Sequence, residues 1–257
     1  MIKSTLLRAA QESGQLIKEM STRSFSISNK EGVNNLVTEV DHASEKLIID
    51  IIRKDFPNHF ILTEESGALV QDSTYKWIID PIDGTVNFAN GIPLCCVSIG
   101  VEKDGEVIFG VVYNPFMNEF FYAEKNAGAF LNDKPISVSS KSSVLTSCLV
   151  TGFPYTYIDH SNGPLEVFSR FIRKGIPVRR LGSAAIDLCW VAMGRFDGFF
   201  EHSLNPWDSA AGFLMVNESG GMVTDFKGEP YSLYQPGIIA TNGKIHQELV
   251  EWVNNRI

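Results

Sequence analysis

The stretch WIIDPIDGTVNF, residues 77–88, places two carboxylates at the end of an apolar run. Trp77 to Ile79 have the aromatic and β-branched side chains typical of a buried strand. Asp80 follows directly, and Asp83 comes three residues later, just before Gly84. Asp-Pro and Asp-Gly are common turn pairs, so a turn after a strand explains each acid on its own. The alternative interpretation is half of a metal site, and acids elsewhere in the chain bear on that choice.

Four other acids take similar positions. Glu64 and Glu65 end the strand-like stretch HFILTEE. Asp208 begins a helix-like stretch in NPWDSAAG, and Asp41 follows LVTEV and precedes another helix-like stretch. Acids at strand ends and helix starts tend to meet at one edge of an α/β layer, where ligands bind. We therefore expect these carboxylates to lie close together.

Crowded carboxylates repel one another unless a cation holds them. Mg²⁺ binds through a few carboxylates together with waters and substrate phosphate oxygens. No H-E-x-x-H motif or Cys/His cluster accompanies the acids, which makes zinc a poor candidate. Two such ions can polarise a phosphoryl group and generate a nucleophilic hydroxide. Gly84 and Thr85 are expected to add backbone N–H groups at a helix start, where anions bind.

Other phosphate-handling motifs do not match. The chain has no G-x-x-x-x-G-K-[ST] stretch, so a P-loop is excluded. The haloacid dehalogenase family separates its two aspartates by one residue, whereas DPIDGT separates them by two. An aspartate nucleophile is therefore disfavoured.

Composition narrows the class of partner. The chain has 257 residues, 44% of them hydrophobic and 20% charged, as in ordinary globular proteins. A net charge of -8 argues against a nucleic-acid surface, which needs a basic stripe. No apolar run approaches the ~20 residues that span a bilayer, so no membrane partner is expected. The N-terminus lacks the features of a signal peptide and is predicted to be an amphipathic helix.

The cysteines and histidines carry no recognisable motif. Cys95, Cys96, Cys148 and Cys189 lie among apolar residues without a C-x-x-C pair, which favours buried free thiols in a reducing compartment. A cysteine nucleophile is disfavoured because no histidine motif accompanies any of them. The five histidines are scattered and are interpreted as structural or surface residues. We expect a cytoplasmic protein.

The order of predicted elements changes along the chain. Residues 1–143 suggest an α+β half, with helices at the N-terminus and at 43–56 and a run of antiparallel strands from Cys95 to Leu131. Asp104-Gly105 between two apolar runs is a strong hairpin signal. Residues 144–257 alternate strands with helices, which suggests an α/β half. The two halves are expected to be closely joined, with a ligand pocket between them.

Taken together, several stretches closely resemble the inositol monophosphatase family. The two signatures are WIIDPIDGTVNF and PWDSAAG, and the match extends to LVTEVD (36–41), TEES (63–66), RRLGSAAIDLCWVAMGRFDGFFE (179–201) and NESGGMVTDFKGEP (217–230). The resemblance covers nearly the whole chain in the expected order. RRLGSAAIDL and GFP look more like the bacterial inositol-1-monophosphatase branch than the nucleotide-phosphatase branches.

The resemblance implies a layered αβαβα sandwich, lithium sensitivity, a homodimer and two or three Mg²⁺ ions per subunit. It implies as metal ligands Glu64, Asp80, the Ile82 carbonyl, Asp83 and Asp208. It implies that Thr85 and Asp41 activate the attacking water, and that Glu65 supports a further metal or its water shell. It implies as substrate contacts Gly84, Thr85, Gly182, Ser183, Ala184, Glu201 and Asp208, and Lys30 as a mobile-loop lysine. Ser183 stands where the family often has Thr, and TEES replaces the common Gly-Glu-Glu.

The expected function is Mg²⁺-dependent hydrolysis of inositol monophosphate to inositol and phosphate by water, without a phosphoenzyme. A second possibility keeps this chemistry with another phosphate monoester, namely fructose-1,6-bisphosphate, histidinol phosphate or 3′-phosphoadenosine 5′-phosphate. A third is a catalytically silent regulatory protein, which would be expected to have lost one of the site residues. All of these residues are present, so this possibility ranks last.

Overall fold

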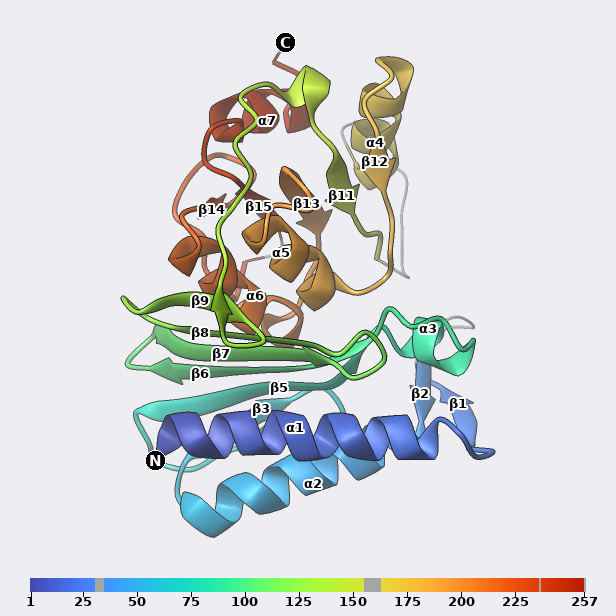
Figure 1. Ribbon diagram of the computed structural model, residues 1–257, viewed down its shortest axis with the longest axis vertical. Coiled ribbons are helices and arrows are strands. Elements are labelled where there is room, and N and C mark those ends of the chain that lie inside the picture. The colour runs from blue at the N-terminus through green and yellow to red at the C-terminus, as the bar shows by residue number, and fades with distance from the viewer. Residues whose placement is uncertain (31–34, 155–162, 236, 257) are drawn as a thin grey trace.

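Helices and sheets alternate in five layers in the computed structural model (Figure 1), which describes residues 1–30, 35–154, 163–235 and 237–256. Helices α1 (Ile2–Met20) and α2 (Glu39–Asp55) cover the outer face of an eight-stranded sheet. Helices α5 (Ala184–Ala192) and α6 (Pro206–Glu218) separate it from a five-stranded sheet. Helices α4 (Pro164–Arg173) and α7 (His246–Val253) lie beyond the smaller sheet. The predicted αβαβα sandwich is confirmed.

The eight-stranded sheet has the order β10-β9-β8-β7-β6-β5-β3-β4. Its strands are β3 (Phe60–Thr63), β4 (Gly67–Leu69), β5 (Tyr75–Asp83), β6 (Cys96–Lys103), β7 (Glu106–Asn114), β8 (Glu119–Glu124), β9 (Gly128–Leu131) and β10 (Lys134–Pro135). All neighbours are antiparallel except β3 and β5. The predicted hairpin joins β6 to β7, with Asp104 at φ 51° and Gly105 at φ 87°. Two positive φ values match a type I′ turn, whose twist suits a two-residue hairpin.

The five-stranded sheet has the order β12-β11-β13-β15-β14. Its strands are β11 (Leu149–Thr151), β12 (Val178–Arg179), β13 (Gly198–His202), β14 (Met222–Thr224) and β15 (Gly237–Thr241). Strand β11 runs parallel to β12 and β13, whereas β15 is antiparallel to both of its neighbours. Strands of the larger sheet lie between residues 60 and 135, and strands of the smaller sheet lie between residues 149 and 241.

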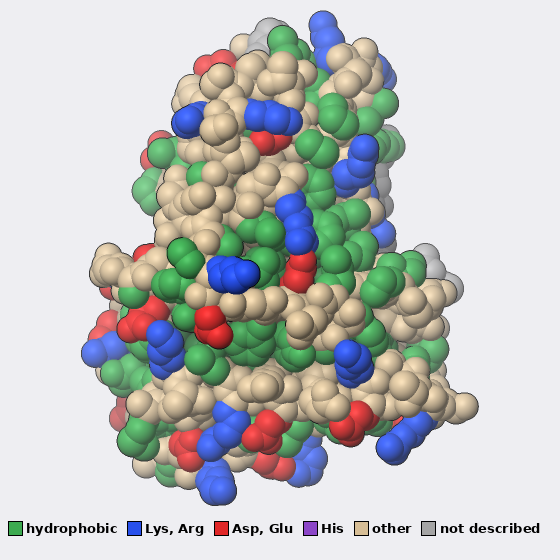
Figure 2. Space-filling model, in the orientation of Figure 1, with side chains coloured by type: hydrophobic (Ala, Val, Ile, Leu, Met, Phe, Trp, Pro, Cys, Tyr) green, Lys and Arg blue, Asp and Glu red, His purple; other side chains and the backbone are tan. Residues whose placement is uncertain are grey.

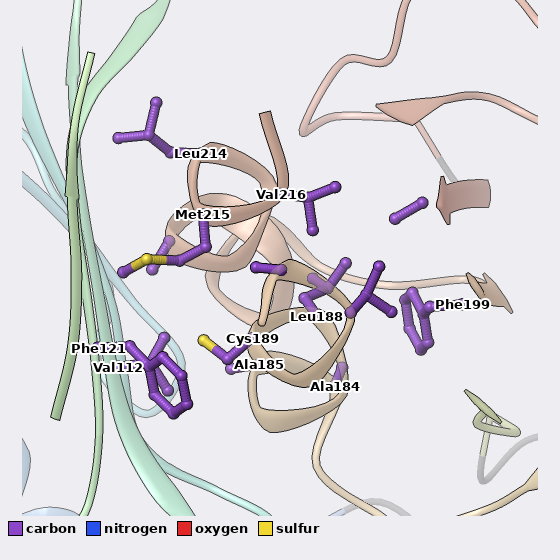
Figure 3. Packing of buried hydrophobic residues seen from close by; sticks show 14 of the residues in the cluster. Val112, Phe121, Ala184, Ala185, Leu188, Cys189, Phe199, Leu214, Met215 and Val216 are labelled. Atoms are coloured by element: carbon purple, nitrogen blue, oxygen red, sulfur yellow. The ribbon is translucent and has the colours of Figure 1, made fainter. Parts of the chain in front are cut away.

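Helices α5 and α6 carry the core that joins the two sheets. Figure 3 shows Leu188 and Cys189 of α5 beside Met215 of α6, between Phe121 of the larger sheet and Phe199 of the smaller one. All five side chains are buried. Since neighbouring residues of a strand face opposite sides of its sheet, Phe200 enters a separate cluster under α4 and α7. One apolar cluster therefore connects β5, α5, α6 and β13.

Two element boundaries differ from the prediction near the signature acids. Helix α2 begins at Glu39 rather than at residue 43, because the Thr38 hydroxyl caps it and Asp41 completes a capping box. Asp41 therefore lies inside the helix rather than before it. Strand β5 continues through Asp83 instead of ending in a turn at Asp80.

Short elements complete the fold. They are β1 (Ile27–Asn29), β2 (Leu36–Thr38), α3 (Thr85–Ala89) and the 3₁₀ helix η1 (Val144–Thr146). All four cysteines are free, and Cys148 is half-buried rather than buried as expected. None of the helices in the described residues is long and apolar enough to cross a bilayer. On the face shown in Figure 2, Lys and Arg side chains are interspersed with Asp and Glu.

Candidate active site

Most of the predicted site residues line one cavity of about 460 Å³. The predicted residues in its wall are Glu64, Asp80, Ile82, Asp83, Gly84, Thr85, Gly182, Ser183, Ala184, Glu201 and Asp208. Asp41, Glu65 and Lys30 are not in the wall. Asp41 bonds to Thr85 and Lys30 bonds to Glu64, both of which are in the wall, and Glu65 bonds to Lys30. Segments far apart in the sequence thus meet at one place.

A β-bulge brings Asp80 and Asp83 to the same face of the larger sheet. In a regular strand, residues three apart point to opposite faces. Here Asp80 pairs with Ser98 while Asp83 pairs with Cys96, so three steps on β5 oppose two steps on β6. The extra residue restores the shared direction of the two carboxylates. Pro81 lies within this irregular segment, where its missing N–H breaks no regular ladder bond.

The start of helix α5 fixes the orientation of Asp83. Its Oδ2 accepts hydrogen bonds from the Ser183 hydroxyl at 2.7 Å and from the Ala185 backbone N–H at 2.7 Å. Burial raises the pKa of Asp83 to about 6, although the hydrogen bonds from Ser183 and Ala185 oppose that effect. Because Ser183 and Ala185 both donate to Oδ2, these two hydrogen bonds leave Oδ1 of Asp83 available to a ligand.

Asp80 and Asp208 are held in a similar way by backbone donors. Asp80 Oδ1 accepts from the Ile82 N–H at 3.0 Å. Asp208 Oδ2 accepts from the Asn205 N–H at 2.6 Å, as part of the capping box of α6. Burial raises the pKa of Asp80 well above its usual range, and the charges of Glu64 and Asp83 add to it. Burial also raises the pKa of Asp208 strongly, with the Asp83 charge as the next cause.

This donor set fits a hard divalent cation. The groups offered are carboxylate oxygens and the Ile82 carbonyl, and the buried carboxylates repel one another, a repulsion that a cation relieves. Within the described residues, no three His, Cys, Asp or Glu side chains converge closely enough to make a ready metal cage. The residues that would hold the ion are Glu64, Asp80, Ile82, Asp83 and Asp208.

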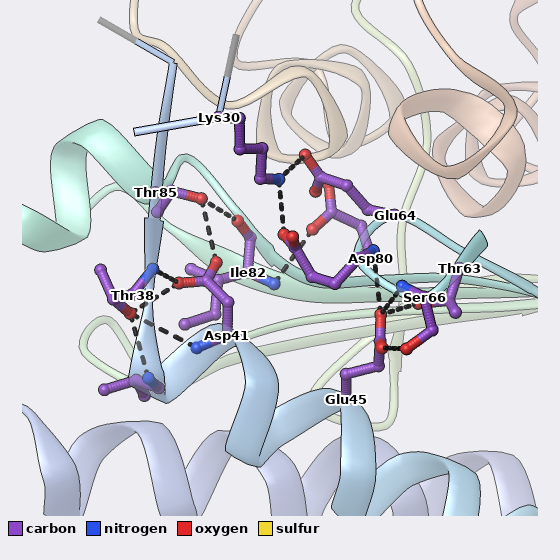
Figure 4. A network of polar contacts seen from close by, with 12 residues as sticks. Lys30, Thr38, Asp41, Glu45, Thr63, Glu64, Ser66, Asp80, Ile82 and Thr85 are labelled. Atoms are coloured by element: carbon purple, nitrogen blue, oxygen red, sulfur yellow. Dashed lines mark hydrogen bonds and ion pairs between the residues drawn. The ribbon is translucent and has the colours of Figure 1, made fainter. Parts of the chain in front are cut away.

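Thr85 connects the cavity to Asp41. Its hydroxyl lies 3.1 Å from Asp41 Oδ1 and 3.0 Å from the Ile82 carbonyl oxygen, both of which can accept its hydrogen (Figure 4). Asp41 Oδ2 is occupied by the N–H and hydroxyl of Thr38, at 2.8 and 2.6 Å. Burial raises the pKa of Asp41, while the hydrogen bonds from Thr38 and Thr85 lower it. The capping function and the bond to Thr85 thus use different oxygens of one carboxylate.

Lys30 supplies positive charge beside the acids. Its ammonium donates to Glu64 Oε1 at 2.7 Å and to Glu65 Oε1 at 2.5 Å (Figure 4). Burial raises the pKa of Glu65 to about 7, although the hydrogen bond from Lys30 opposes the increase. Lys30 therefore forms an ion pair with Glu64, which is one of the predicted metal ligands.

A buried carboxylate from α2 holds the turn that presents Glu64. Glu45 accepts hydrogen bonds from the hydroxyls of Thr63 and Ser66 and from the N–H groups of Glu65 and Ser66 (Figure 4). Asp41 and Glu45 are four residues apart, so one face of α2 reaches two parts of the site. The sequence prediction did not include Glu45, although its spacing from Asp41 was a usable signal.

The other end of the cavity holds the predicted substrate contacts. Gly84 at φ 91° and Gly182 at φ 89° lie where the two loops approach closely, since a Cβ on Gly84 would fall 3.2 Å from the Gly182 carbonyl oxygen. Glu201 lies near the C-terminal end of β13, is buried, and lines the cavity wall. A Cβ on Gly152 would fall 2.1 Å from Glu201 Oε1, so any larger residue there would displace the Glu201 carboxylate.

The sequence prediction missed several residues of the wall. They include Gly152, Phe153, Arg180, Asp187, Ser203 and Asn205. Signals were available for Gly152, Phe153 and Asp187. Residues 152–154 follow directly after β11, and Asp187 lies four residues after Ser183 on the same helix. Their position at the end of a strand and along one helix face would have pointed to the cavity.

The sequence and the fold of this chain are similar to those of known proteins. A sequence model of the inositol monophosphatase family matches residues 2–257. An inositol-1-monophosphatase from Synechocystis is 48% identical over 226 residues, covering 87% of this chain and 78% of that protein. Nus factor SuhB from Haemophilus influenzae is 43% identical over 246 residues, covering 95% and 92%. The structure of an inositol monophosphatase from Anabaena superposes with a TM-score of 0.85 at 38% identity, covering 98% and 94%.

Proposed function

Because the chain belongs to the inositol monophosphatase family, we propose that its cavity is the active site of a Mg²⁺-dependent phosphomonoesterase acting on inositol monophosphate. The observation that carries the proposal is the meeting of Glu64, Asp80, Asp83 and Asp208 in one wall, with Thr85 bonded to Asp41 beside them. A divalent cation bound there supplies Lewis acidity toward the phosphoryl group and acidifies water.

Thr85 and Asp41 accept the proton of the attacking water. Thr85 Oγ1 donates its hydrogen to Asp41 Oδ1 and keeps its lone pairs for a water in the cavity. The proton released as water attacks passes toward Asp41, whose raised pKa makes it a better acceptor at neutral pH. The attack is in line, and no residue forms a phosphoenzyme.

The far end of the wall binds the alcohol portion of the ester. Glu201 accepts hydroxyl hydrogens, and the backbone at Gly182 to Ala184 lies against the same space. The N–H groups of Gly84 and Thr85 are proposed to hold the phosphate. The acid-lined wall favours a polyhydroxylated, uncharged leaving group over an anionic one.

A panel of phosphate esters at fixed Mg²⁺ tests the substrate. We expect the highest kcat/KM for inositol 1-phosphate, with lower values for fructose-1,6-bisphosphate, histidinol phosphate and 3′-phosphoadenosine 5′-phosphate. A higher value for any of these alternatives would keep the chemistry and replace the substrate. Absence of phosphate release from every ester would contradict the proposed function.

A non-enzymatic role is the second candidate, because relatives named Nus factor SuhB share 42–43% identity with this chain. Such a role alone would tolerate loss of the acids, yet all the proposed ligands are retained around the cavity. Mg²⁺-dependent phosphate release that stops with a chelator would show that the chain is an enzyme, whatever other role it has.

Three further properties are proposed from the family. They are a homodimer, two or three Mg²⁺ ions per subunit with sensitivity to lithium, and a cytoplasmic location. Sedimentation equilibrium and calorimetric titration with Mg²⁺ test the first two.

A further inference from the structure

Asp187 is a buried carboxylate to which the proposed mechanism assigns no role. It lies on α5, one helical turn after Ser183, and lines the cavity. Only 1% of its surface is exposed, and its Oδ1 has no hydrogen-bond partner among the described residues. A buried oxygen without a partner lowers the stability of the folded state.

Two buried acids away from the cavity, Asp197 and Glu119, accept a hydrogen bond at each carboxylate oxygen, whereas Asp187 leaves Oδ1 without a partner among the described residues. Asp197 accepts from the Ser139 hydroxyl at 2.6 Å and from the Cys148 N–H at 2.7 Å. Glu119 accepts from the Trp190 indole at 2.9 Å and from Arg195 at 2.5 Å. An unpartnered buried polar group in a native protein calls for an explanation, and a partner supplied from the adjoining cavity is one.

The neighbours of Asp187 indicate the kind of ligand. Burial raises its pKa well above the usual range, and the charge of Glu201 is the next cause. Glu201 is itself buried and lines the same cavity, and Gly152 leaves the space for its carboxylate. Arg180 lies in the same wall, and its charge acts on both acids. Two acceptor groups beside a guanidinium donor are complementary to a molecule with several hydroxyl groups.

We infer that Asp187 determines specificity for polyhydroxylated phosphate esters, because its unpartnered oxygen accepts a hydroxyl hydrogen of the bound alcohol portion next to Glu201. This inference rests on the proposed phosphatase function. In this role Asp187 contacts the alcohol portion of the substrate and does not contact the phosphoryl group. Selectivity of this kind is strong when a site is built around a hydroxyl, since the alternative ligand leaves a buried group unpaired.

Kinetics with two substrates test the inference. The variants are Asp187→Leu, which keeps the branched shape without oxygen, and Asp187→Asn, which keeps one acceptor oxygen. The substrates are inositol 1-phosphate and p-nitrophenyl phosphate, whose leaving group has no further hydroxyl. For Asp187→Leu we expect kcat/KM for inositol 1-phosphate to fall about 10-fold or more, with little change for p-nitrophenyl phosphate. Asp187→Asn should show a smaller decrease in the same direction.

Thermal stability separates this role from a structural one. Because Asp187→Leu removes an unpartnered buried oxygen, its melting temperature should equal or exceed that of the unsubstituted protein. Asp197→Asn is the matched control: it breaks a satisfied network away from the cavity, so it should lower the melting temperature and leave the ratio of the two kcat/KM values unchanged.

Two results would overturn the inference. One is an unchanged ratio of kcat/KM values in Asp187→Leu, and the other is an equal loss for both substrates with a lower melting temperature. If the unsubstituted protein hydrolyses neither ester, the proposed function is contradicted and the inference falls with it. If it hydrolyses both and the ratio does not move, the phosphatase function stands and only the role of Asp187 is overturned.

Discussion

At the residue scale, the two oxygens of a single carboxylate have different roles: one accepts hydrogen bonds from the protein, and the other faces the site. In Asp83, Oδ2 is taken by Ser183 and Ala185, and in Asp41, Oδ2 is taken by Thr38. Such bonds fix the plane of a carboxylate before any ligand arrives, which lowers the ordering cost of binding. The hydroxyl of Ser183 is therefore expected to act on the site through Asp83.

Replacement of Ser183 tests this dependence. Ser183→Ala removes the 2.7 Å bond to Asp83, and losses of such supporting bonds typically lower metal affinity or activity about 10- to 100-fold. Ser183→Thr keeps the hydroxyl and should stay within a few-fold of the unsubstituted protein. Calorimetric Mg²⁺ titration and steady-state kinetics of both variants provide the measurement. Equal values for the two variants would show that the hydroxyl does not orient Asp83.

At the element scale, His246 joins helix α7 to the smaller sheet. Its Nε2 lies 2.9 Å from the Thr224 hydroxyl, and its Nδ1 lies 2.9 Å from the Thr241 hydroxyl. The Thr224 hydroxyl donates to the Asp225 carbonyl, so it accepts from Nε2–H, and Nδ1 accepts from Thr241. This arrangement needs a neutral imidazole, and burial lowers the pKa of His246 to about 4.

The pKa of His246 predicts an acid-dependent loss of stability. As the pH falls through ~6.5, His246 is protonated in the unfolded chain, whereas in the folded chain it stays neutral down to about pH 4. The free energy of unfolding therefore decreases between these two pH values. Between pH 7.5 and 5 the loss from this residue is about 2 kcal/mol. Denaturant unfolding of the unsubstituted protein and of His246→Gln at both pH values isolates it. The same pH dependence in both proteins would refute the assignment.

The bulge in β5 shows what the sequence pattern could not predict at this scale. The acids at 80 and 83 were recognised, and so was the strand before them. The turn expected there was wrong, because the irregularity arises from the pairing of β5 with β6, and both a turn and a bulge tolerate Pro81. Asp187 was missed for a similar reason, since a lack of partners is a property of the folded neighbourhood.

At the scale of the whole molecule, the site depends on how α6 sits on the larger sheet. Asp208 reaches the cavity from α6, whereas Asp80 and Asp83 reach it from β5. Gly100 on β6 allows the close approach, because a Cβ there would lie 2.8 Å from the Ala210 Cβ. The layered architecture was predictable from the order of elements and the family resemblance, whereas this contact was not, since it depends on the packing of residues far apart in sequence.

Paired substitutions at this contact test the packing. Gly100→Ala should destabilise the protein by about 1–3 kcal/mol through overpacking. Ala210→Gly should cost about 1 kcal/mol in the helix but also vacate the space that the new methyl group needs. The double variant should therefore be less destabilised than the sum of the single variants, as measured by denaturant unfolding. Additive losses of unfolding free energy would mean that residues 100 and 210 are not in steric contact.

The central claim is that the carboxylates of this cavity support Mg²⁺-dependent phosphate ester hydrolysis. The most direct measurement is phosphate release from inositol 1-phosphate by the unsubstituted protein and by Asp83→Asn, with Mg²⁺ and with a chelator. We predict release by the unsubstituted protein only with Mg²⁺, and background rates for Asp83→Asn at an unchanged melting temperature. A near-normal rate in Asp83→Asn would contradict the account.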